Sequence, residues 1–426
     1  MSNVDDDLPV SPEDRRELGM MLTEDTGRPP DCSTPAPAAD GDAPTLADVH
    51  EVFRRGLYLP DPAVVDVPIA ATVANLMPDI DPVFLMVVGA GSRGKTAGIE
   101  AQNDIPQVHA LSSLSKATLF SGYIDSKKPE KDHSLLPRLT RAGVRVLLLK
   151  DFTTVLAMHR NDRGEILAQL REVFDGSFVK ETGTGREVVW EGHMGFVAGV
   201  TPAIDEHHGV LAILGERFVY LRVPDVDRPR STEAALRARG KDRELRQKRR
   251  RVVARFVAGL EGLQAPELTE EVERHVVTLS DFTARARTGV ARDGYSREVV
   301  ALPELEAPMR LAKQLASMWS ALRLIGYEEE AATAMLERLA TDSIPPVRRV
   351  CLEYLRHHGR SKTTTVAEDL GLPTNTARRA LEDLALLKVI VRDKESQSSN
   401  APDWWDVPHG GQGSLDNGED PPPILP

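Results

Sequence analysis

Short apolar runs separated by helical stretches dominate the first half of the chain. Five of these runs have the length and continuous hydrophobicity of buried strands. They span residues 83–88 (VFLMVV), 107–111, 144–149 (VRVLLL), 195–200 (GFVAGV) and 218–223 (FVYLRV). Helices are expected between them, over 95–102 and 165–174. Because strands that alternate with helices form a mostly parallel sheet with helices on its faces, the pattern predicts an α/β fold.

The pattern changes twice in the second half of the chain. After Pro224 only helical periodicity is found, and near Pro345 a new series of helices begins that ends in a strand. We therefore expect an α/β core over residues 46–225, a helical region over 226–340 and a separate unit over 341–395.

Both ends of the chain differ from its body in charge. Residues 1–45 carry a net charge of −8 and residues 396–426 carry −5, so the total of −12 leaves +1 for the body between them. Large apolar residues are scarce in both ends, which cannot bury enough surface to offset the entropy of ordering. We predict that both acidic tails are disordered. Trp404 and Trp405 in the second tail could form a docking peptide, although we favour packing against their own domain.

Several classes of protein are excluded by features that the sequence lacks. No run of about 18 apolar residues is present, so no segment is expected to span a membrane. The first residues have neither the basic region nor the apolar core of a secretory signal. Cys32 and Cys351 are far apart and lack metal-ligand spacing, which indicates a reducing compartment and no zinc site. We expect a cytoplasmic protein.

One motif carries most of the predicted chemistry. It fits G-x-x-x-x-G-K-[ST] in full, as Gly89, Ala90, Gly91, Ser92, Arg93, Gly94, Lys95 and Thr96. Its glycines let successive backbone N–H groups point at phosphate oxygens. Lys95 would contact the β and γ phosphates of ATP, and the Thr96 hydroxyl would ligate Mg²⁺. A glycine-rich turn with an incidental lysine is the alternative, but the strand before the motif and the helix after it favour nucleotide binding.

A nucleotide-hydrolysing site also needs an acid close to the Mg²⁺ ion. Asp151 is the candidate, because it follows the apolar run 144–149 almost directly. Lys150 precedes it and no second acid follows, so Asp151 either holds the metal, with the base elsewhere, or is itself the base. Glu165 and Glu172 could help, although each fits a solvated helix position.

Two further residues are candidates for catalysis. Thr201 follows the run 195–200 and would lie beside the γ phosphate, where a polar side chain could orient the attacking water. A plain turn before Pro202 is the other interpretation. Arg217 precedes the last apolar run and could stabilise transition-state charge at the nucleotide of a neighbouring subunit. Otherwise it forms a surface salt bridge. Arg310, in the helical region, is a weaker candidate for a phosphate sensor.

The order of strand, phosphate motif, acid, Thr-ended strand and Gly-Glu-Arg-Phe resembles the AAA+ ATPases, which implies an AAA+/RecA-like P-loop core with a helical lid. Within that group the chain is similar to helicase-type ATPases of phages and other mobile elements, akin to superfamily 3 and MCM proteins. Residues 177–190 read as a β-hairpin placed just before the Thr-ended strand. The resemblance implies that this hairpin grips DNA in the channel of a ring, with Lys180 and Arg186 near its tip.

The unit over 341–395 is typical of a winged helix-turn-helix. A helix over 346–358 precedes a second helix that ends near Gly371, where the chain needs a left-handed turn. Thr374 is expected to cap the third helix, whose core face holds Leu381 and Leu384.

In such a unit the third helix reads DNA. Candidates for base and phosphate contacts are Asn375, Thr376, Arg378 and Arg379 in that helix and Arg392 in the wing. Winged helices also serve as protein-interaction modules, but the arginines favour DNA. The basic stretch 237–251 could line a DNA channel or form a solvated helix face.

Two functions of different class follow from these predictions. The first is a DNA-dependent ATPase of helicase, translocase or helicase-loader type, which acts in phage or mobile-element DNA replication and assembles into a homo-oligomeric, hexamer-type ring. The second is a transcriptional regulator that uses the nucleotide as a switch, with little turnover. A small-molecule kinase has little support, because such enzymes rarely carry a winged helix.

Overall fold

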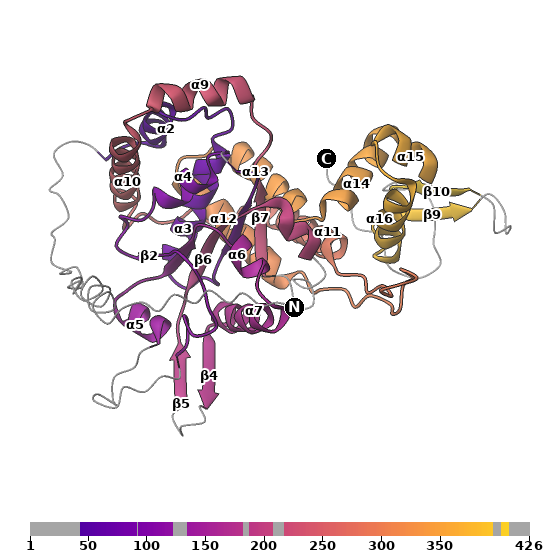
Figure 1. Ribbon diagram of the computed structural model, residues 1–426, viewed down its shortest axis with the longest axis horizontal. Helices are drawn as coiled ribbons and strands as arrows, with labels where there is room; N and C mark the ends of the chain where they lie inside the picture. Colours follow the sequence, from indigo (N-terminus) through magenta and orange to yellow (C-terminus); the bar gives the residue numbers. More distant parts are fainter. Residues whose placement is uncertain are drawn as a thin grey trace, which may run out of the picture. The chain divides into compact units, whose positions relative to one another are not determined.

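A five-stranded parallel sheet forms the centre of the α/β part of the chain (Figure 1). The computed structural model describes residues 43–91, 93–121, 134–181, 187–207, 217–394 and 402–408. The sheet has the order β2-β3-β6-β1-β7, and every neighbouring pair is parallel. Its strands are β1 (Phe84–Val88), β2 (Val108–Leu111), β3 (Val146–Leu149), β6 (Gly195–Val200) and β7 (Phe218–Arg222). The predicted α/β fold with a mostly parallel central sheet is confirmed.

Side chains that alternate along the strands divide the core into two layers. Leu85 and Val87 of β1 point into the first layer, and Phe84 and Met86 point into the second. The first layer is formed by α2 (Leu46–Arg54), α3 (Ala63–Leu76), α4 (Lys95–Glu100), α10 (Asp242–Ala258), α11 (Glu270–Arg287), α12 (Met309–Leu324) and α13 (Glu329–Asp342). The second is formed by α5 (Leu135–Arg141), α6 (Thr153–Leu156) and α7 (Arg160–Asp175). Because both faces are covered, the strands are apolar on both sides.

Helix α3 lies at the heart of the first layer. All its residues from Ala63 to Asn75 are buried, so it has no polar face and gives no amphipathic signal in the sequence. Its backbone approaches α4 so closely that a Cβ at Gly98 would collide with the carbonyl oxygen of Val64. This contact fixes the helix that follows the phosphate motif against the core.

The predicted hairpin at 177–190 is present in the described residues. Strands β4 (Ser177–Glu181) and β5 (Glu187–Glu191) pair antiparallel, and Phe178 and Trp190 bury their rings in the second layer. Arg186 lies outside the described residues, together with the rest of the tip. Lys180 is half exposed and pairs with Glu165 of α7 at 3.8 Å.

Helices follow β7, as the sequence predicts, but with two long interruptions, at residues 259–269 between α10 and α11 and at residues 288–308 between α11 and α12. The helices are α9 (Arg228–Ala238) and α10 to α13. The longer interruption, residues 288–308, holds only one isolated bridge, between Arg292 and Val299. The expectation of helix throughout this region is therefore wrong for these residues. None of the helices in the described ranges is long and apolar enough to cross a lipid bilayer.

The last described part contains three helices and a small antiparallel sheet. Its elements are α14 (Pro346–His358), α15 (Thr363–Asp369), α16 (Thr374–Leu386), β8 (Ser361–Lys362), β9 (Val391–Lys394) and β10 (Asp403–Asp406). Gly371 adopts the expected left-handed conformation, with φ of 63°. Thr374 does not cap α16, because the helix already starts at Thr374 and Pro373 occupies the capping position without a side-chain hydrogen bond.

Strand β10 corrects the prediction that the chain from residue 396 onward is a disordered tail. It lies between β8 and β9 in the sheet order β8-β10-β9. Trp405 is fully buried, and its indole N–H donates to the Thr363 hydroxyl at 2.8 Å. Trp404 lies beneath the cations of Arg360 and Lys362. Both tryptophans thus pack on their own unit, because burial of two large rings outweighs the polar composition around them.

Candidate nucleotide site at the carboxyl edge of the central sheet

The glycine loop, residues 89–96, connects the carboxyl end of β1 to α4. The Gly89 N–H donates to the Val200 carbonyl at 3.0 Å, which ties the start of the loop to the neighbouring strand β6. Gly94 has a φ of 85°, a conformation that glycine adopts without strain. Gly91 is exposed, and a Cβ there would meet no atom within 4 Å, so nothing crowds the outer side of the loop at this residue. Ser92 lies outside the described residues.

Lys95 turns back over this loop. Its side chain is 9% exposed, and its Nζ donates to the Ala90 carbonyl at 3.0 Å. Burial lowers the pKa of Lys95, while the nearby charge of Asp151 partly opposes that shift. The only hydrogen bond that the described residues give this ammonium group is to a neutral carbonyl. A charged phosphate oxygen would be a stronger acceptor for it. Thr96, the next residue, is exposed in the first turn of α4.

The predicted acid and the predicted threonine lie at the same edge of the sheet. Asp151 follows β3 and Thr201 follows β6, and β6 separates β3 from β1. The Phe152 N–H donates to the Gly199 carbonyl at 2.7 Å, which holds the end of β3 beside the end of β6. The carboxyl ends of parallel strands meet at one edge, where ligands bind in such sheets. Lys95, Thr96, Asp151 and Thr201 are thus gathered at one edge.

Thr153 connects two of these residues and was not predicted from the sequence. Its backbone N–H donates to Asp151 Oδ1 at 2.9 Å. Its hydroxyl donates to Thr201 Oγ1 at 3.2 Å and accepts from the Thr201 N–H, also at 3.2 Å. The Asp-x-Thr spacing directly after a strand is the sequence signal for such a turn, since an aspartate often accepts from the N–H two residues later.

The unusual lysine before Asp151 has a partner of its own. Lys150 forms an ion pair with Glu100 at the end of α4. Glu100 is buried and also faces Arg246 of α10, at 3.7 Å. Thr96, Glu100, Arg246 and Arg249 are among the residues that line a pocket of about 200 Å³ between α4 and α10. Lys150 therefore neutralises a buried acid, while the exposed carboxylate of Asp151 stays at the edge of the sheet.

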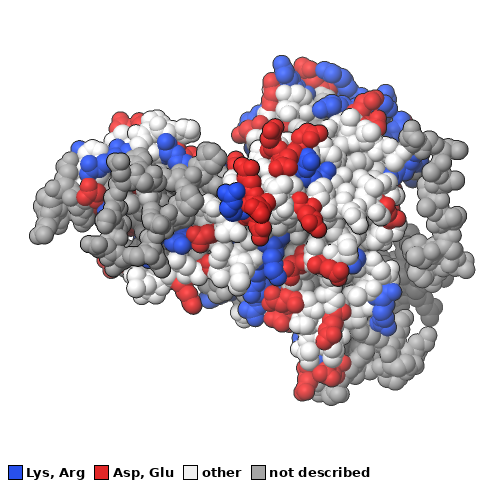
Figure 2. All heavy atoms as spheres, turned by 180° about the vertical axis from the view of Figure 1, so that it is seen from behind, with Lys and Arg blue, Asp and Glu red and all other residues white. Residues whose placement is uncertain are grey.

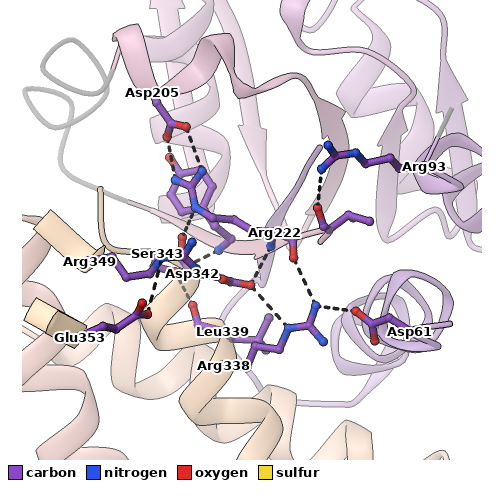
Figure 3. Close-up of polar contacts among 12 residues, drawn as sticks. Asp61, Arg93, Asp205, Arg222, Arg338, Leu339, Asp342, Ser343, Arg349 and Glu353 are labelled. Carbon is purple, nitrogen blue, oxygen red and sulfur yellow. Dashed lines mark hydrogen bonds and ion pairs between the residues drawn. The ribbon is translucent and has the colours of Figure 1, made fainter. Parts of the chain in front are cut away.

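The opposite flank of the glycine loop is tied to β7. Arg93 donates to the Val223 carbonyl at 3.1 Å and forms an ion pair with Asp225. One residue earlier, Arg222 holds Asp205 through two hydrogen bonds of 2.7 and 2.9 Å (Figure 3). The end of β7 thus connects the loop with the 3-10 helix (Pro202–His207) that follows Thr201.

A buried carboxylate completes this ionic cluster. Asp342, at the end of α13, accepts from the Arg222 N–H and from Arg349 of α14, each at 2.8 Å (Figure 3). Arg338 approaches it to 3.7 Å and donates to Asp61 at 2.7 Å. Burial raises the pKa of Asp342, and the hydrogen bond from Arg222 and the charges of the three arginines oppose that shift. The cluster joins the end of β7 to the first helix of the C-terminal unit.

Arg217 lies at the other edge of the sheet. It directly precedes β7, whose first residue pairs with the first residue of β1, so Arg217 is at the amino edge and away from the glycine loop. It is buried and contacts Asp175 at 2.8 Å. Burial lowers the pKa of Arg217, and the charge of Arg310 adds to that effect. Arg310 therefore lies near Arg217, and a phosphate-sensing role for it stays a prediction.

The remaining acids considered for the base belong to α7. Glu165 pairs with Lys180 at 3.8 Å and Glu172 with Arg171 at 3.4 Å, and both ion pairs are exposed. Neither glutamate is tied to the carboxyl edge by any contact among the described residues. Both keep the solvated helix positions that the sequence suggests.

The residues predicted to bind DNA differ in how free they are. Asn375, Arg378 and Arg379 of α16 are exposed, and Thr376 is half buried. Arg392 contacts Asp403 of β10 at 2.8 Å, with its guanidinium over the Trp405 ring. Its charge is thus partly engaged within its own sheet.

The basic stretch is less uniform than its sequence suggests. Figure 2 shows Lys and Arg interspersed with Asp and Glu over α9 and α10. Arg237 pairs with Glu233 and Lys248 with Glu244, each one helical turn apart. Arg249 is half buried, with its guanidinium over the Phe53 ring. Part of the positive charge therefore serves packing and local ion pairs.

Comparison with known proteins gives similar structures only. No family model matches the sequence, and no curated protein matches it significantly. A candidate ATPase from Cytophaga hutchinsonii has 12% sequence identity, with 70% of this chain and 85% of that chain covered and a TM-score of 0.42. The SCCmec type IV Cch helicase has 10% identity, coverage of 86% and 70%, and a TM-score of 0.36. The Aeropyrum pernix ORC1 protein, solved in complex with DNA, has 15% identity, coverage of 84% and 92%, and a TM-score of 0.25.

Such low scores do not assign a function, since one fold serves many chemistries. What this chain does has to be inferred from its own residues.

Proposed function

We propose that this chain is an AAA+-type ATPase that acts on DNA. The observation that carries the proposal is the complete phosphate motif at the carboxyl edge, with Lys95, Thr96, Asp151 and Thr201 gathered around it. The left-handed conformation of Gly94 and the ammonium of Lys95, which turns back over the loop to the Ala90 carbonyl, suit the triphosphate of ATP. The domains are an ATPase core at 46–225, a helical lid at 226–340 and a winged helix-turn-helix at 341–395.

Each group at this edge has a role in hydrolysis. Lys95 neutralises the β and γ phosphates as charge moves toward the leaving oxygen. Thr96 and Asp151 would hold Mg²⁺, which supplies positive charge at the phosphates when bound. Exposed oxygens of a hydroxyl and a carboxylate fit that ion's preference for oxygen ligands. Water adds to the γ phosphorus, the bond to the β-γ bridging oxygen breaks, and ADP and inorganic phosphate leave.

Arg217 is proposed to act on the nucleotide of a neighbouring subunit. Its place at the amino edge keeps it away from the glycine loop of its own chain, so only another copy could bring a nucleotide to it. Within its own chain, Arg217 forms an ion pair with the half-exposed Asp175. A ring of identical subunits, of hexamer type, gives every nucleotide one such arginine.

DNA is the proposed partner of the C-terminal unit. Helices α15 and α16, joined by the left-handed turn at Gly371, and the sheet β8-β10-β9 support a winged helix-turn-helix. The exposed side chains of Asn375, Arg378 and Arg379 on α16 are proposed to contact bases and phosphates. The hairpin β4–β5, with Lys180 and Arg186, is proposed as a second DNA contact. ATP hydrolysis and DNA binding would be coupled in a helicase, translocase or helicase loader that acts in phage or mobile-element replication.

Turnover of ATP is the decisive measurement. We expect purified protein to release phosphate from ATP, faster with single- or double-stranded DNA, and Lys95→Ala to lower kcat on the order of 100-fold or more because it removes charge stabilisation. Lys248→Ala, which removes an exposed lysine paired with Glu244, is the matched control and should keep the rate. Binding of ATP without turnover, with or without DNA, would instead favour a nucleotide-switched transcriptional regulator.

DNA binding by α16 is tested separately. We expect Arg378→Ala and Arg379→Ala each to weaken binding of duplex DNA by about 1–3 kcal/mol in fluorescence anisotropy at fixed salt. Arg237→Ala on α9, which is paired with Glu233, should change binding far less. Equal affinities for all three variants and the unaltered protein would contradict a reading role for α16 and leave protein interaction as its task.

A further inference from the structure

The hydroxyl of Thr153 has a defined place at the carboxyl edge. Thr153 begins α6, and its side chain is half buried between the end of β3 and the end of β6. It contributes two hydrogen bonds to Thr201, one to the hydroxyl and one from the backbone N–H, each of 3.2 Å. A third bond, from its own N–H to Asp151 Oδ1, fixes the residue that carries the hydroxyl. Asp151, Thr153 and Thr201 are therefore connected by hydrogen bonds through Thr153.

The direction of these bonds decides what Thr201 can do. A hydroxyl has one proton to donate and two lone pairs to accept with. Thr153 Oγ1 accepts a hydrogen bond from the Thr201 N–H and donates one to Thr201 Oγ1. Thr201 Oγ1 is thus already an acceptor, and its own proton is left for another partner. Thr201 is prepared as a hydrogen-bond donor.

A donor at this edge suits a phosphate better than a water molecule that must lose a proton. Phosphate oxygens accept hydrogen bonds and gain negative charge as the bond to ADP breaks. From this geometry we infer that Thr153 is a positioning residue for the proposed hydrolysis, which turns the Thr201 hydroxyl toward the γ phosphate. The inference rests on the proposed function, and it directs the Thr201 hydroxyl to the γ phosphate instead of the attacking water that the sequence analysis expected.

The experiment removes the hydroxyl and keeps the shape. Thr153→Val should lower kcat by about 10-fold or more, as loss of an orienting partner does, while ADP affinity stays unchanged. Affinity for ATP should fall by a few fold, about the value of one hydrogen bond. Thr153→Ser restores the hydroxyl and should recover most of the rate. Thr154→Val is the matched control, because within the described residues the exposed Thr154 hydroxyl donates to the backbone carbonyl of Asp151 and makes no bond to Thr201.

A second background separates positioning from a purely structural role. In Thr201→Val the hydroxyl that Thr153 orients is gone, so adding Thr153→Val should cost no further activity. If the Thr153→Val effect persists there in full, or if Thr153→Val turns over ATP like the unaltered protein, the inference is wrong. Equal melting midpoints confirm that the variants fold.

The outcome stays readable if the protein binds ATP without hydrolysing it. The ratio of ATP to ADP affinity then reports the γ-phosphate contact. A lower ratio in Thr153→Val supports the assignment, and an unchanged ratio contradicts it. Absence of turnover in the unaltered protein contradicts the proposed ATPase and leaves this comparison intact.

Discussion

The two edges of the central sheet are built from the same five strands and differ in how their polar groups are used. At the amino edge, buried side chains bond to the strand ends. Asn75 exchanges hydrogen bonds with Val83, Gln314 accepts from the Phe84 N–H, and Arg287 donates to the Phe218 carbonyl. At the carboxyl edge, Thr96 and Asp151 are exposed, and the hydrogen bond that Lys95 makes with the described residues is to a carbonyl.

This difference shows how a parallel sheet can separate stability from chemistry. Backbone groups buried without partners cost free energy, so the amino edge gains stability from every side chain that caps a strand. The carboxyl edge keeps charged and hydroxyl groups that a ligand can engage. Substitutions at the two edges should therefore differ in kind: loss of folding at one, loss of binding and turnover at the other.

The largest expected effect contrasts two glycines, one at each edge. A Cβ at Gly195 would overlap the Asn75 amide, whereas a Cβ at Gly91 would meet nothing within 4 Å. We expect Gly195→Ala to lower the free energy of unfolding by about 4 kcal/mol, because it displaces Asn75 from its bonds as well as crowding the core. Gly91→Ala should change it by less than about 0.5 kcal/mol.

Urea unfolding followed by circular dichroism measures both variants. Similar losses for the two glycines would show that the edges are equally rigid and would remove the distinction drawn between them.

A smaller effect should come from pH at the amino edge. His193 lies two residues before β6, 3.2 Å from Asn75 Oδ1, and burial together with the charge of Arg145 lowers its pKa to about 4. The unfolded state binds a proton near pH 6.5 and the folded state does not until about pH 4. Stability should therefore fall as pH drops through this window, by at most about 3 kcal/mol.

Chemical denaturation of the unaltered protein and of His193→Gln between pH 7 and pH 4 measures this contribution. The His193→Gln variant should lose less stability over that range than the unaltered protein. If stability fell equally with pH in the two proteins, the pKa of His193 would be the same in the folded and unfolded states, and the edge would be open to water.

Much of this arrangement could be predicted from sequence because it depends on local pattern. Continuous apolar runs predicted the five strands, and the spacing of Gly89, Gly94, Lys95 and Thr96 predicted a loop between a strand and a helix. Asp151 and Thr201 were found because parallel strands bring their carboxyl ends together, so that position along a strand predicts position in space.

What the sequence did not predict depends on contacts between distant residues. Helix α3 is apolar on every side and shows no helical period, and Lys150 pairs with Glu100 from 50 positions away. Arg310 looked available in the sequence, but α12 places it at the amino edge beside Arg217. Strand β10 was missed since its four residues lie within an acidic, proline-containing stretch.

Strand β10 also sets an order of events during synthesis. It is the central strand of its sheet, yet it is the last of the three to be made, and β8 and β9 each pair only with it among the described strands. Since chains fold progressively from the amino terminus as they are made, helices α14 to α16 can form before residues 403–406 exist, but the sheet cannot. A chain truncated between residues 395 and 402 would keep its phosphate loop but would lack β10. It would expose two unpaired strand edges, which favour aggregation.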